Sequence, residues 1–532
     1  MLDRAPNCEH VITMVLLLFF VQLILGICHV TADLPIHVLV KDVTGKWQFY
    51  LTKPLGGLDV MCGSSMPNTL EGNLKLGNYL DYLKSHYTLD RNFQLELSLD
   101  VISYSDTSNK PNRYKWRALA VKDAAGKVVG RWTIVNDQGF EVLLDDSTRY
   151  FFYIRYTQNG DMFETDPNHT QIGWAYRPGN LSAAGTERRC AFASKVNALT
   201  PPQTTLVKLH TNVTEMFKQI DRSITNNGTI HGAIKSAHIS PKRGLYPCEC
   251  ANKERLHFDD QLPIHFEGKT RATIPIVNQD SCGSCHAIAS RYVLQSRILI
   301  ALERMSNRSP ELEGILDELS HYTFDPKDVT DCSMYNQGCD GGYPYLMGKQ
   351  MREFGILTTK NAGQQCTLLS TERRYFARDY GYVGGCHQCT ACQGDALIMR
   401  EILANGPVVT AIDAAVLTAD YDGHIITSAE EGTNSGICDM EHHPILTGWE
   451  YTSHAVAIVG WGQEKVGARM IKYWICRNSW GQNWGINGHF KIERGKNAYG
   501  IESEAVFIDP DFSKFAQEPA ASFYTRSPPY KI

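Results

Sequence analysis

The chain has 532 residues, which at about 100–200 residues per domain indicates two to four structural units. Hydrophobic residues make up 43% and charged residues 20%, a balance typical of globular proteins that bury a core. Lysine and arginine total 52 against 57 aspartate and glutamate, a net charge of −5, so no basic excess indicates a nucleic-acid partner.

An apolar stretch over Val11–Ile27 precedes a small residue, Ala32, with Val30 two positions earlier. This pattern is typical of a secretory signal peptide over residues 1–32, whose removal would leave Asp33 as the first residue. An uncleaved signal anchor is the alternative, because the stretch is just short of a span of about 20 residues. No later segment is apolar enough to cross a bilayer.

Cysteine and glycosylation patterns agree with a secretory route. The chain holds 16 cysteines, which pair as disulfides in oxidising compartments. It also carries Asn-x-Ser/Thr triplets, the acceptor pattern for N-glycosylation. These triplets lie at Asn168, Asn180, Asn212, Asn227 and Asn307.

Residues 33–192 are predicted to form an all-β domain. Aromatic and β-branched residues alternate or concentrate in short runs, as in Trp47–Leu51, Phe93–Leu99 and Arg149–Tyr156. Asn136–Gly139 is a predicted hairpin turn. An antiparallel barrel or sandwich is the simplest closure for such strands.

Residues 193–261 change character, with two adjacent prolines and two glycosylation triplets, and predict a connecting propeptide that is removed. Residues 262–510 have a mixed pattern and form the next predicted domain. Residues 511–532 lack periodicity and are predicted to be a flexible tail.

Within residues 262–510, a helix is predicted from Ser284 to about Met305, because apolar residues recur three to four apart. Strands are predicted at Ala455–Val459 and Tyr473–Cys476.

Four residues in this region predict nucleophilic catalysis. Cys285 would stand at the N-terminus of the predicted helix, which favours the thiolate. His454 is the expected base, and Asn478 is the group expected to orient its imidazole. Gln279 can donate its side-chain amide to a developing oxyanion, together with the backbone N–H of Cys285.

The residues around this set resemble the papain family of cysteine peptidases over about 262–510, and within it the dipeptidyl peptidase I (cathepsin C) group. The papain-like motifs are Cys282–Cys285, Gly338–Gly342, His454–Val456 and Asn478–Gly481. The narrower resemblance rests on Tyr343–Leu346, Tyr382–Gly385 and an N-terminal domain similar to the group's exclusion domain, which matches at Gly45–Trp47, Asn136–Val142, Gly173–Trp174 and Arg189–Phe192.

The resemblance implies an α+β protein: a two-lobed papain-like catalytic domain, with a helical lobe and a β-barrel lobe, preceded by an all-β exclusion domain that is an antiparallel barrel. It implies a cysteine exopeptidase that removes dipeptides from free N-termini through a thioester acyl-enzyme. The exclusion domain would block the cleft beyond two substrate residues. Asp33, with its amino group and its carboxylate, would anchor the N-terminus of the substrate.

The substrate-binding set implied by the resemblance is Asp33, Gly341, Gly342, Pro344 and Glu504. Glu504 departs from the dipeptidyl peptidase I pattern, which has an apolar residue there, and resembles cathepsin B, where a glutamate lies at the base of the second subsite. A carboxylate there would pair with a Lys or Arg as the first substrate residue. The alternative is that Glu504 turns to solvent or is neutralised by a neighbour.

The resemblance also implies a bound chloride ion near Tyr343, Tyr345 and Tyr382, and no metal or organic cofactor. The Cys386–Cys392 run has a spacing that suits zinc or iron–sulfur ligation. No fourth ligand is evident, and an oxidising compartment favours disulfides over a metal there.

Three disulfides follow from the resemblance: Cys62–Cys190, Cys282–Cys339 and Cys332–Cys366. With Cys285 and these pairs set aside, an odd number of cysteines remains after the signal peptide, so at least one is expected to be free. These are Cys248, Cys250, Cys386, Cys389, Cys392, Cys438 and Cys476. Cys476, two residues before Asn478, is expected to act as a buried small hydrophobe.

The expected partners are peptide and protein substrates with free N-termini and an activating protease, with no nucleic acid and no membrane span after signal cleavage. A homo-tetramer is implied by the resemblance alone. The expected compartment is a lysosome-like or secretory-vesicle lumen, or the outside of the cell. Two alternatives stay open: an endopeptidase whose N-terminal domain is a retained proregion, and a catalytically silent binding paralogue, against which the intact Gln–Cys–His–Asn set argues.

Overall fold

The computed structural model describes residues 38, 40–55, 62, 78–103, 110, 113, 116–136, 138–159, 162–178, 187–197, 206–208, 262–268, 270–361, 373–385, 394–417, 420–427 and 452–514. The predicted signal peptide and Asp33 lie outside these residues. Among the helices within them, none is both long enough and apolar enough to cross a membrane.

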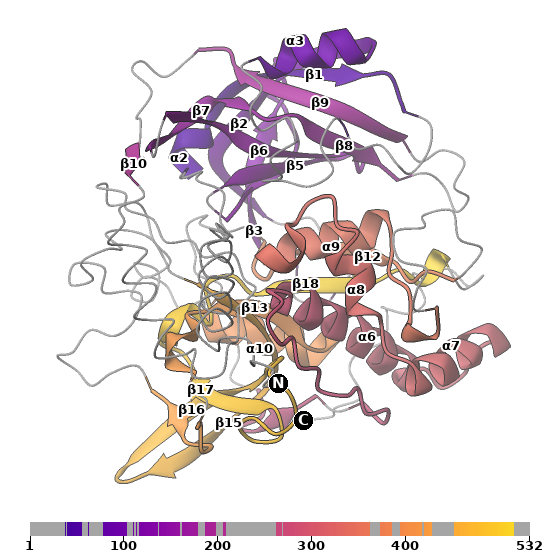
Figure 1. Ribbon diagram of the computed structural model, residues 1–532, viewed down its shortest axis with the longest axis vertical. Helices are drawn as coiled ribbons and strands as arrows, with labels where there is room; N and C mark the ends of the chain where they lie inside the picture. The colour runs from indigo at the N-terminus through magenta and orange to yellow at the C-terminus, as the bar shows by residue number, and fades with distance from the viewer. Residues whose placement is uncertain are drawn as a thin grey trace, which may run out of the picture. The chain divides into compact units, whose positions relative to one another are not determined.

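The N-terminal part is an antiparallel barrel with two short helices, α2 (Val40–Val43) and α3 (Tyr79–His86) (Figure 1). Its strands are β1 (Gly45–Thr52), β2 (Leu89–Ser103), β3 (Arg117–Lys122), β4 (Val128–Val135), β5 (Gly139–Leu144), β6 (Arg149–Asn159), β7 (Met162–Thr170), β8 (Gly173–Arg177), β9 (Glu187–Lys195) and β10 (Leu206–Lys208). They are ordered β1-β2-β3-β4-β5-β6-β8-β9, and β9 pairs with β1. Eight strands therefore close on themselves, which confirms the predicted antiparallel barrel.

Alternating burial along β1 explains why these residues form a barrel wall. Trp47, Phe49 and Leu51 are buried, whereas Lys46 is exposed. The ring of Phe49 stacks on that of Phe93 at 5.4 Å between centroids. Burial of each such side chain is worth about 1.5–3 kcal/mol, so the aromatic runs stabilise the closed barrel.

The barrel extends past residue 192, where the predicted β domain ends. Strand β9 continues to Lys195, where Ser194 and Lys195 pair with β1. The Lys195 ammonium donates to the Asp42 carbonyl and lies 5.6 Å from the Trp47 ring centroid, so its stem packs on the barrel. Strand β10 also pairs with β7, although it lies inside the predicted connecting segment.

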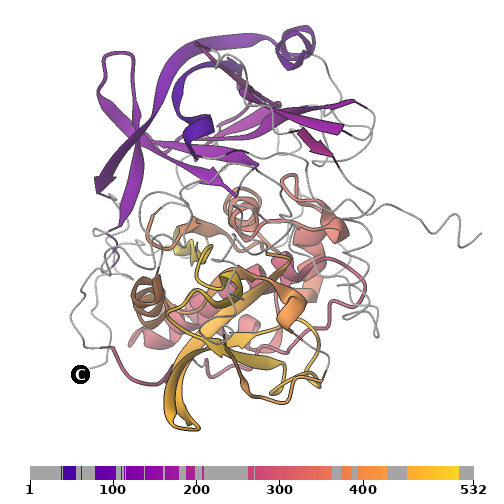
Figure 2. The same cartoon turned by 90° about the vertical axis from the view of Figure 1, so that its left-hand side faces the viewer.

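The C-terminal part combines a helical region with a sheet, which agrees with the papain-like fold. Its longer helices are α6 (Cys285–Arg304), α7 (Pro310–His321), α8 (Pro326–Thr330), α9 (Pro344–Glu353) and α10 (Gly394–Asn405). Its strands are β11 (Phe266–Glu267), β12 (Ala377–Tyr382), β13 (Val408–Ile412), β14 (Ile425–Ile426), β15 (His454–Val466), β16 (Arg469–Arg477), β17 (His489–Glu493) and β18 (Val506–Pro510). The order is β12-β18-β13-β15-β16-β17-β14, and β15 with β16 forms the long hairpin seen in Figure 2.

Helix α6 is buried along most of its length and packs against β15 and β18. It begins at Cys285, directly after the predicted start at Ser284, and ends one residue before Met305, whose backbone is extended. A long buried helix fixes its own N-terminus, and so the position of Cys285, against the first strand residues of β15.

Cysteine pairing follows the resemblance where the residues are described. Cys62–Cys190 and Cys282–Cys339 are disulfides. Cys332 is also disulfide-bonded, and its expected partner lies outside the described residues. Cys476 is a buried free thiol whose pKa is raised by burial, which keeps it a neutral hydrophobe.

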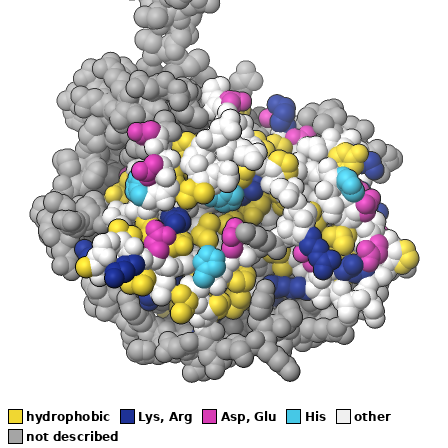
Figure 3. Space-filling model, turned by 90° about the horizontal axis from the view of Figure 1, so that it is seen from below, with side chains coloured by type: hydrophobic (Ala, Val, Ile, Leu, Met, Phe, Trp, Pro, Cys, Tyr) yellow, Lys and Arg dark blue, Asp and Glu magenta, His cyan; other side chains and the backbone are white. Residues whose placement is uncertain are grey.

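A buried group of charges joins the barrel part to the peptidase part. This seam cluster comprises Lys110, Arg113, Arg297, Glu401 and Asp509, of which the first two lie between β2 and β3. The Arg113 guanidinium is 2.7 Å from Asp509 and 2.6 Å from Glu401, and Arg297 is 2.7 Å from Asp509. Lys110 is also paired with Asp509. On the face drawn in Figure 3, by contrast, acidic and basic side chains are interspersed at the surface.

Two glycines after β12 allow the barrel to approach closely. The Arg117 N–H donates to the Gly384 carbonyl at 2.9 Å, where β3 begins. A Cβ at Gly385 would lie 1.9 Å from the Arg117 carbonyl oxygen, and the φ of Gly385 is +115°. Only glycine fits this close backbone approach, which explains the Gly-Gly pair after Tyr382.

Candidate active site

Cys285 is the first residue of α6 and is fully buried. The backbone N–H of Ala455 donates to its Sγ at 3.1 Å, which places the thiol beside the residue that follows His454. The N-terminal end of a helix stabilises negative charge, so this position favours a thiolate.

His454 opens β15, and Asn478 follows β16, its neighbour in the sheet. His454 Nε2 and Asn478 Oδ1 are 2.7 Å apart. Because a carbonyl oxygen only accepts, Nε2 carries the hydrogen and donates it. The Ser479 N–H donates to the same oxygen at 2.8 Å, and the Trp480 ring lies 5.1 Å from the imidazole centroid. The imidazole is thus held in one tautomer and covered on one side.

Burial lowers the pKa of His454 to about 4, while the contact with Asn478 raises it. The imidazole is therefore neutral above about pH 4. An anionic thiolate at Cys285 would stabilise the imidazolium and raise this pKa again.

Gln279 is buried and bound to the same loop as Asn478. Its Oε1 accepts from Ser479 Oγ at 2.5 Å, and its Nε2 donates to the Cys282 carbonyl at 3.2 Å. One chain of hydrogen bonds therefore runs from Gln279 through Ser479 to Asn478 and His454. The structure brings together all four residues that the sequence singled out.

The glycines predicted to bind substrate lie beside the residue that follows Cys285. A Cβ at Gly342 would be 2.4 Å from Asn336 Oδ1 and 2.5 Å from His286 Cδ2, so no side chain fits there. Gly341 has a φ of +123°, and Pro344 is the first residue of α9. Close packing therefore requires glycine at position 342, and the positive φ favours glycine at position 341.

Glu504 lies two residues before β18 and is 9% exposed. Strand β18 pairs with β13 at Val506, and β13 pairs with β15 at His454. The Glu504 carboxylate accepts from Asn136 Nδ2 at 3.0 Å. Asn136 comes from the turn between β4 and β5, so the barrel part reaches this residue of the peptidase part.

The loop before Glu504 is organised by a second buried carboxylate. Glu502 accepts from Trp474 Nε1 at 2.8 Å, from the Gly495 N–H at 2.6 Å and from the Asn497 N–H at 3.1 Å. Burial raises the pKa of Glu502 to about 7.

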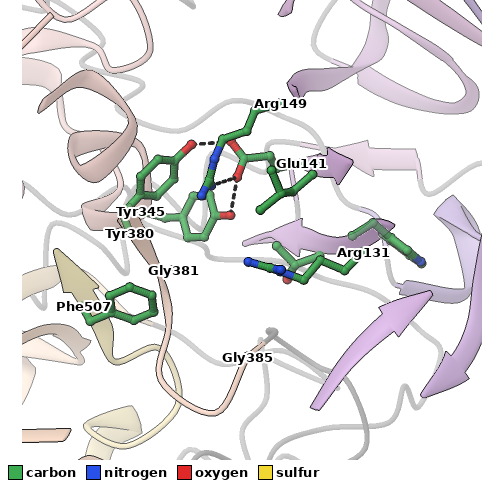
Figure 4. A pocket seen from close by; sticks show the side chains of 11 residues that line it. Arg131, Glu141, Arg149, Tyr345, Tyr380, Gly381, Gly385 and Phe507 are labelled. Atoms are coloured by element: carbon green, nitrogen blue, oxygen red, sulfur yellow. Dashed lines mark hydrogen bonds and ion pairs between the residues drawn. The ribbon is translucent and has the colours of Figure 1, made fainter. Parts of the chain in front are cut away.

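Glu141 on β5 also contacts the peptidase part. Tyr345 Oη donates to it at 2.7 Å, Tyr380 Oη also donates to it, and Arg149 is 2.8 Å away (Figure 4). These four side chains line a cavity of about 30 Å³ between the barrel and the peptidase part. Burial alone would raise the pKa of Glu141, but Arg149 and Lys349 lower it.

Sequence reasoning missed the partners that the barrel supplies. The sequence indicates a turn at Asn136, and it places Glu141 within a matching motif without any role. Their partners Glu504 and Tyr345 lie hundreds of positions away, so no local spacing reports the contacts. Asp33, Cys366 and the Cys386–Cys392 run lie outside the described residues. Within those described, no three His, Cys, Asp or Glu side chains are grouped to hold a metal ion.

Comparison with known proteins agrees with the two parts of the fold. Residues 262–508 match the papain family cysteine protease model, and residues 33–195 match the cathepsin C exclusion domain. Similar curated proteins include dipeptidyl aminopeptidase 1 of Plasmodium falciparum (isolate 3D7), 26% identical over 93% of this chain and 97% of that protein. Cathepsin C of Schistosoma mansoni is 27% identical over 72% of this chain and 84% of that protein. The chain therefore carries a papain-family cysteine protease domain, preceded by a cathepsin C exclusion domain.

Proposed function

We propose that the protein is a dipeptidyl exopeptidase, which removes two residues at a time from free N-termini. The observation that carries the proposal is the contact of the exclusion domain with Glu504, beside the strands that hold His454. A domain attached at this place leaves the peptidase domain a short binding site. The names of the two relatives, a dipeptidyl aminopeptidase and a cathepsin C, support the same activity.

The chemistry is assigned to the four hydrogen-bonded residues. Cys285 Sγ attacks the peptide carbonyl carbon after His454 takes its proton, and Gln279 with the Cys285 N–H stabilises the oxyanion. The C–N bond breaks as His454 returns the proton to the leaving amine, which leaves a thioester. Water, deprotonated by His454, then hydrolyses the thioester and releases the dipeptide. Asn478 holds the imidazole so that Nδ1 exchanges these protons.

Substrate recognition is assigned to both domains. Asp33 would bind the free amino group of the substrate, while Gly341 and Gly342 offer bare backbone beside Pro344. Glu504 would face the first substrate side chain and favour Lys or Arg there. The Asn136 amide that holds the Glu504 carboxylate is neutral, so this contact by itself leaves the charge of the carboxylate in place.

Two of the three tyrosines proposed for a chloride site, Tyr345 and Tyr382, donate their hydroxyl groups to other side chains. Tyr345 Oη donates to Glu141, and Tyr382 Oη donates to Asn136 Oδ1 at 3.3 Å. Glu504, the next acidic group, is bound to the same Asn136. A chloride ion at this place would therefore lie close to two carboxylates, which repel it. A chloride requirement stays a prediction from the resemblance.

Maturation and assembly also stay predictions. They comprise removal of the signal peptide and of the connecting propeptide, an activating protease, a homo-tetramer, and a lysosome-like or secretory location. The family membership supports each of them by analogy alone.

The test is the activity of purified mature enzyme on matched fluorogenic dipeptides with free or acetylated N-termini. We expect release from the free form only, loss of that preference in Asp33→Ala, and no activity in Cys285→Ala, which controls for contaminating peptidases. Equal cleavage of the acetylated form would support the endopeptidase alternative. Inactivity of folded enzyme that also resists a thiol-directed active-site probe would support the silent paralogue.

A further inference from the structure

The turn between β4 and β5 of the exclusion domain presents Asn136 to the peptidase domain. We propose that Asn136 is a specificity-positioning residue, whose amide holds the Glu504 carboxylate ready for a cationic first residue of the substrate. The inference rests on the proposed function and adds a role for the exclusion domain: it shapes the second subsite as well as limiting its length.

Both ends of the Asn136 side chain are engaged with the peptidase domain. Nδ2 donates to Glu504 Oε2 at 3.0 Å, and Oδ1 accepts from Tyr382 Oη at 3.3 Å. Because a carboxylate only accepts, the Nδ2 end must face Glu504, so the amide has one orientation. Asn136 is 5% exposed, and an amide buried this far is held by its partners.

The backbone of the turn is built to present this side chain. Asn136 has a φ of +50°, in the left-handed region that asparagine tolerates better than most residues. The Gln138 N–H donates to the Val135 carbonyl at 3.3 Å, and the Ile154 N–H donates to the Gln138 carbonyl at 2.9 Å. The turn is therefore fastened to β6, and Asn136 cannot move away without breaking these bonds.

The β4–β5 hairpin also holds two stacked tyrosines, Tyr382 and Tyr345, near Glu504. Tyr382 stacks on Tyr345 with ring centroids 4.7 Å apart, and Tyr345 donates to Glu141 on β5. Two residues of one hairpin, Asn136 and Glu141, thus hold Glu504 and both stacked tyrosines. The position of the Glu504 carboxylate depends on a residue from the other domain.

Charge explains why a neutral amide suits this role. A lysine or arginine in place of Asn136 would pair with Glu504 and cancel its charge, whereas an amide orients the carboxylate and leaves the charge for the substrate. The Asn136 contact therefore favours a cationic substrate side chain over a neutral side chain of the same shape.

The test compares two fluorogenic dipeptides with free N-termini, one beginning with arginine and one with its neutral isostere citrulline. The enzymes are the mature wild type, Asn136→Gly, Glu504→Gln and the double variant. Glycine keeps the left-handed backbone at position 136 and removes only the amide. Ser147→Gly is the matched control, because Ser147 is an exposed residue with a φ of +69° in the β5–β6 turn of the same domain.

We expect Asn136→Gly to lower the arginine-to-citrulline ratio of kcat/KM about tenfold, mainly through KM for the arginine substrate. Glu504→Gln should lower the ratio at least as much, and adding Asn136→Gly to it should change the ratio less than about twofold. Ser147→Gly should leave the ratio at the wild-type value.

An unchanged ratio in Asn136→Gly, or an equal loss on both substrates, would overturn the inference and leave Asn136 a structural turn residue. A lower arginine-to-citrulline ratio in Glu504→Gln, with no change in Asn136→Gly, would also overturn the inference. None of these results would contradict the proposed function. The proposed function is contradicted by a different result: wild-type enzyme that cleaves acetylated substrates but releases neither dipeptide with a free N-terminus.

Discussion

The catalytic centre and the seam cluster are both buried, yet opposite kinds of interaction hold them. Neutral hydrogen bonds link Gln279, Ser479, Asn478 and His454. In the seam cluster, by contrast, three cations meet two carboxylates. Neutral groups that are hydrogen-bonded cost less to bury than charges do. A change in the catalytic centre should therefore cost less stability than loss of one seam charge, which leaves the other charges uncompensated.

The first way to test this contrast is Asp509→Asn. It leaves Lys110, Arg113 and Arg297 buried with Glu401 as the remaining carboxylate of the cluster. We expect the free energy of unfolding to fall by about 3–5 kcal/mol, measured by urea denaturation followed by fluorescence. Asn478→Ala, which alters the catalytic centre, should cost less stability than Asp509→Asn while it abolishes most activity.

The matched control is Glu313→Gln, which makes the same change of carboxylate to amide in a surface ion pair: Glu313 lies 2.8 Å from Arg308 Nε, and its side chain is 52% exposed. A pair of this kind contributes about 0–1 kcal/mol. If Asp509→Asn cost no more than Glu313→Gln, burial of charge would not be what joins the two domains.

A smaller effect is expected from Gly385→Ala, which tests the backbone contact of the seam. The added Cβ would overlap the Arg117 carbonyl, so the two domains must separate locally. Gly467→Ala is the control, since Gly467 has a φ of +60° and a Cβ there would have no atom within 4 Å. We expect Gly467→Ala to lower the free energy of unfolding by about 1 kcal/mol, and Gly385→Ala to lower it by at least twice as much, as measured by urea denaturation. Equal costs would mean that the left-handed backbone, and not the close approach, sets the penalty.

A pH-dependent effect on stability is expected from Glu502 on the catalytic side. Its pKa rises from 4.5 to about 7 on folding, so the folded state binds the proton more tightly. Its contribution to stability is therefore complete below about pH 4.5 and is lost as pH rises through 7. Asp509 behaves in the opposite way. Burial raises its pKa, but the nearby Arg113, Lys110 and Arg297 lower it by more, so the folded-state pKa lies below 3.8. Its contribution to stability is therefore present above pH 3.8 and is lost as the pH falls below that value.

Glu502→Gln should therefore flatten the dependence of Tm on pH between about 4.5 and 7.5, whereas the wild type should lose several degrees over that range. Differential scanning calorimetry at both pH values measures this directly. The same slope in both proteins would assign the pH dependence to other groups.

Local patterns allowed much of the fold to be predicted. The run of aromatic residues at Trp47–Leu51 identified β1, and apolar spacing identified α6 to within one residue at each end. Each of the four candidate catalytic residues lies in a short motif that can be recognised from the residues directly beside it in the sequence. Lys110 and Arg113, in contrast, lie in a polar stretch that is typical of a solvated loop, and their burial depends on carboxylates almost 300 and 400 positions away.

The order of the seam residues along the chain has a consequence for assembly. Lys110, Arg113 and Arg117 precede the predicted connecting propeptide, and Glu401 and Asp509 follow it. A cut in that segment would turn an intramolecular contact into an interface between separate polypeptides. Association would then depend on protein concentration instead of on a tether with a fixed effective concentration. Dilution of the processed enzyme would test how strongly the seam cluster alone holds the two pieces together.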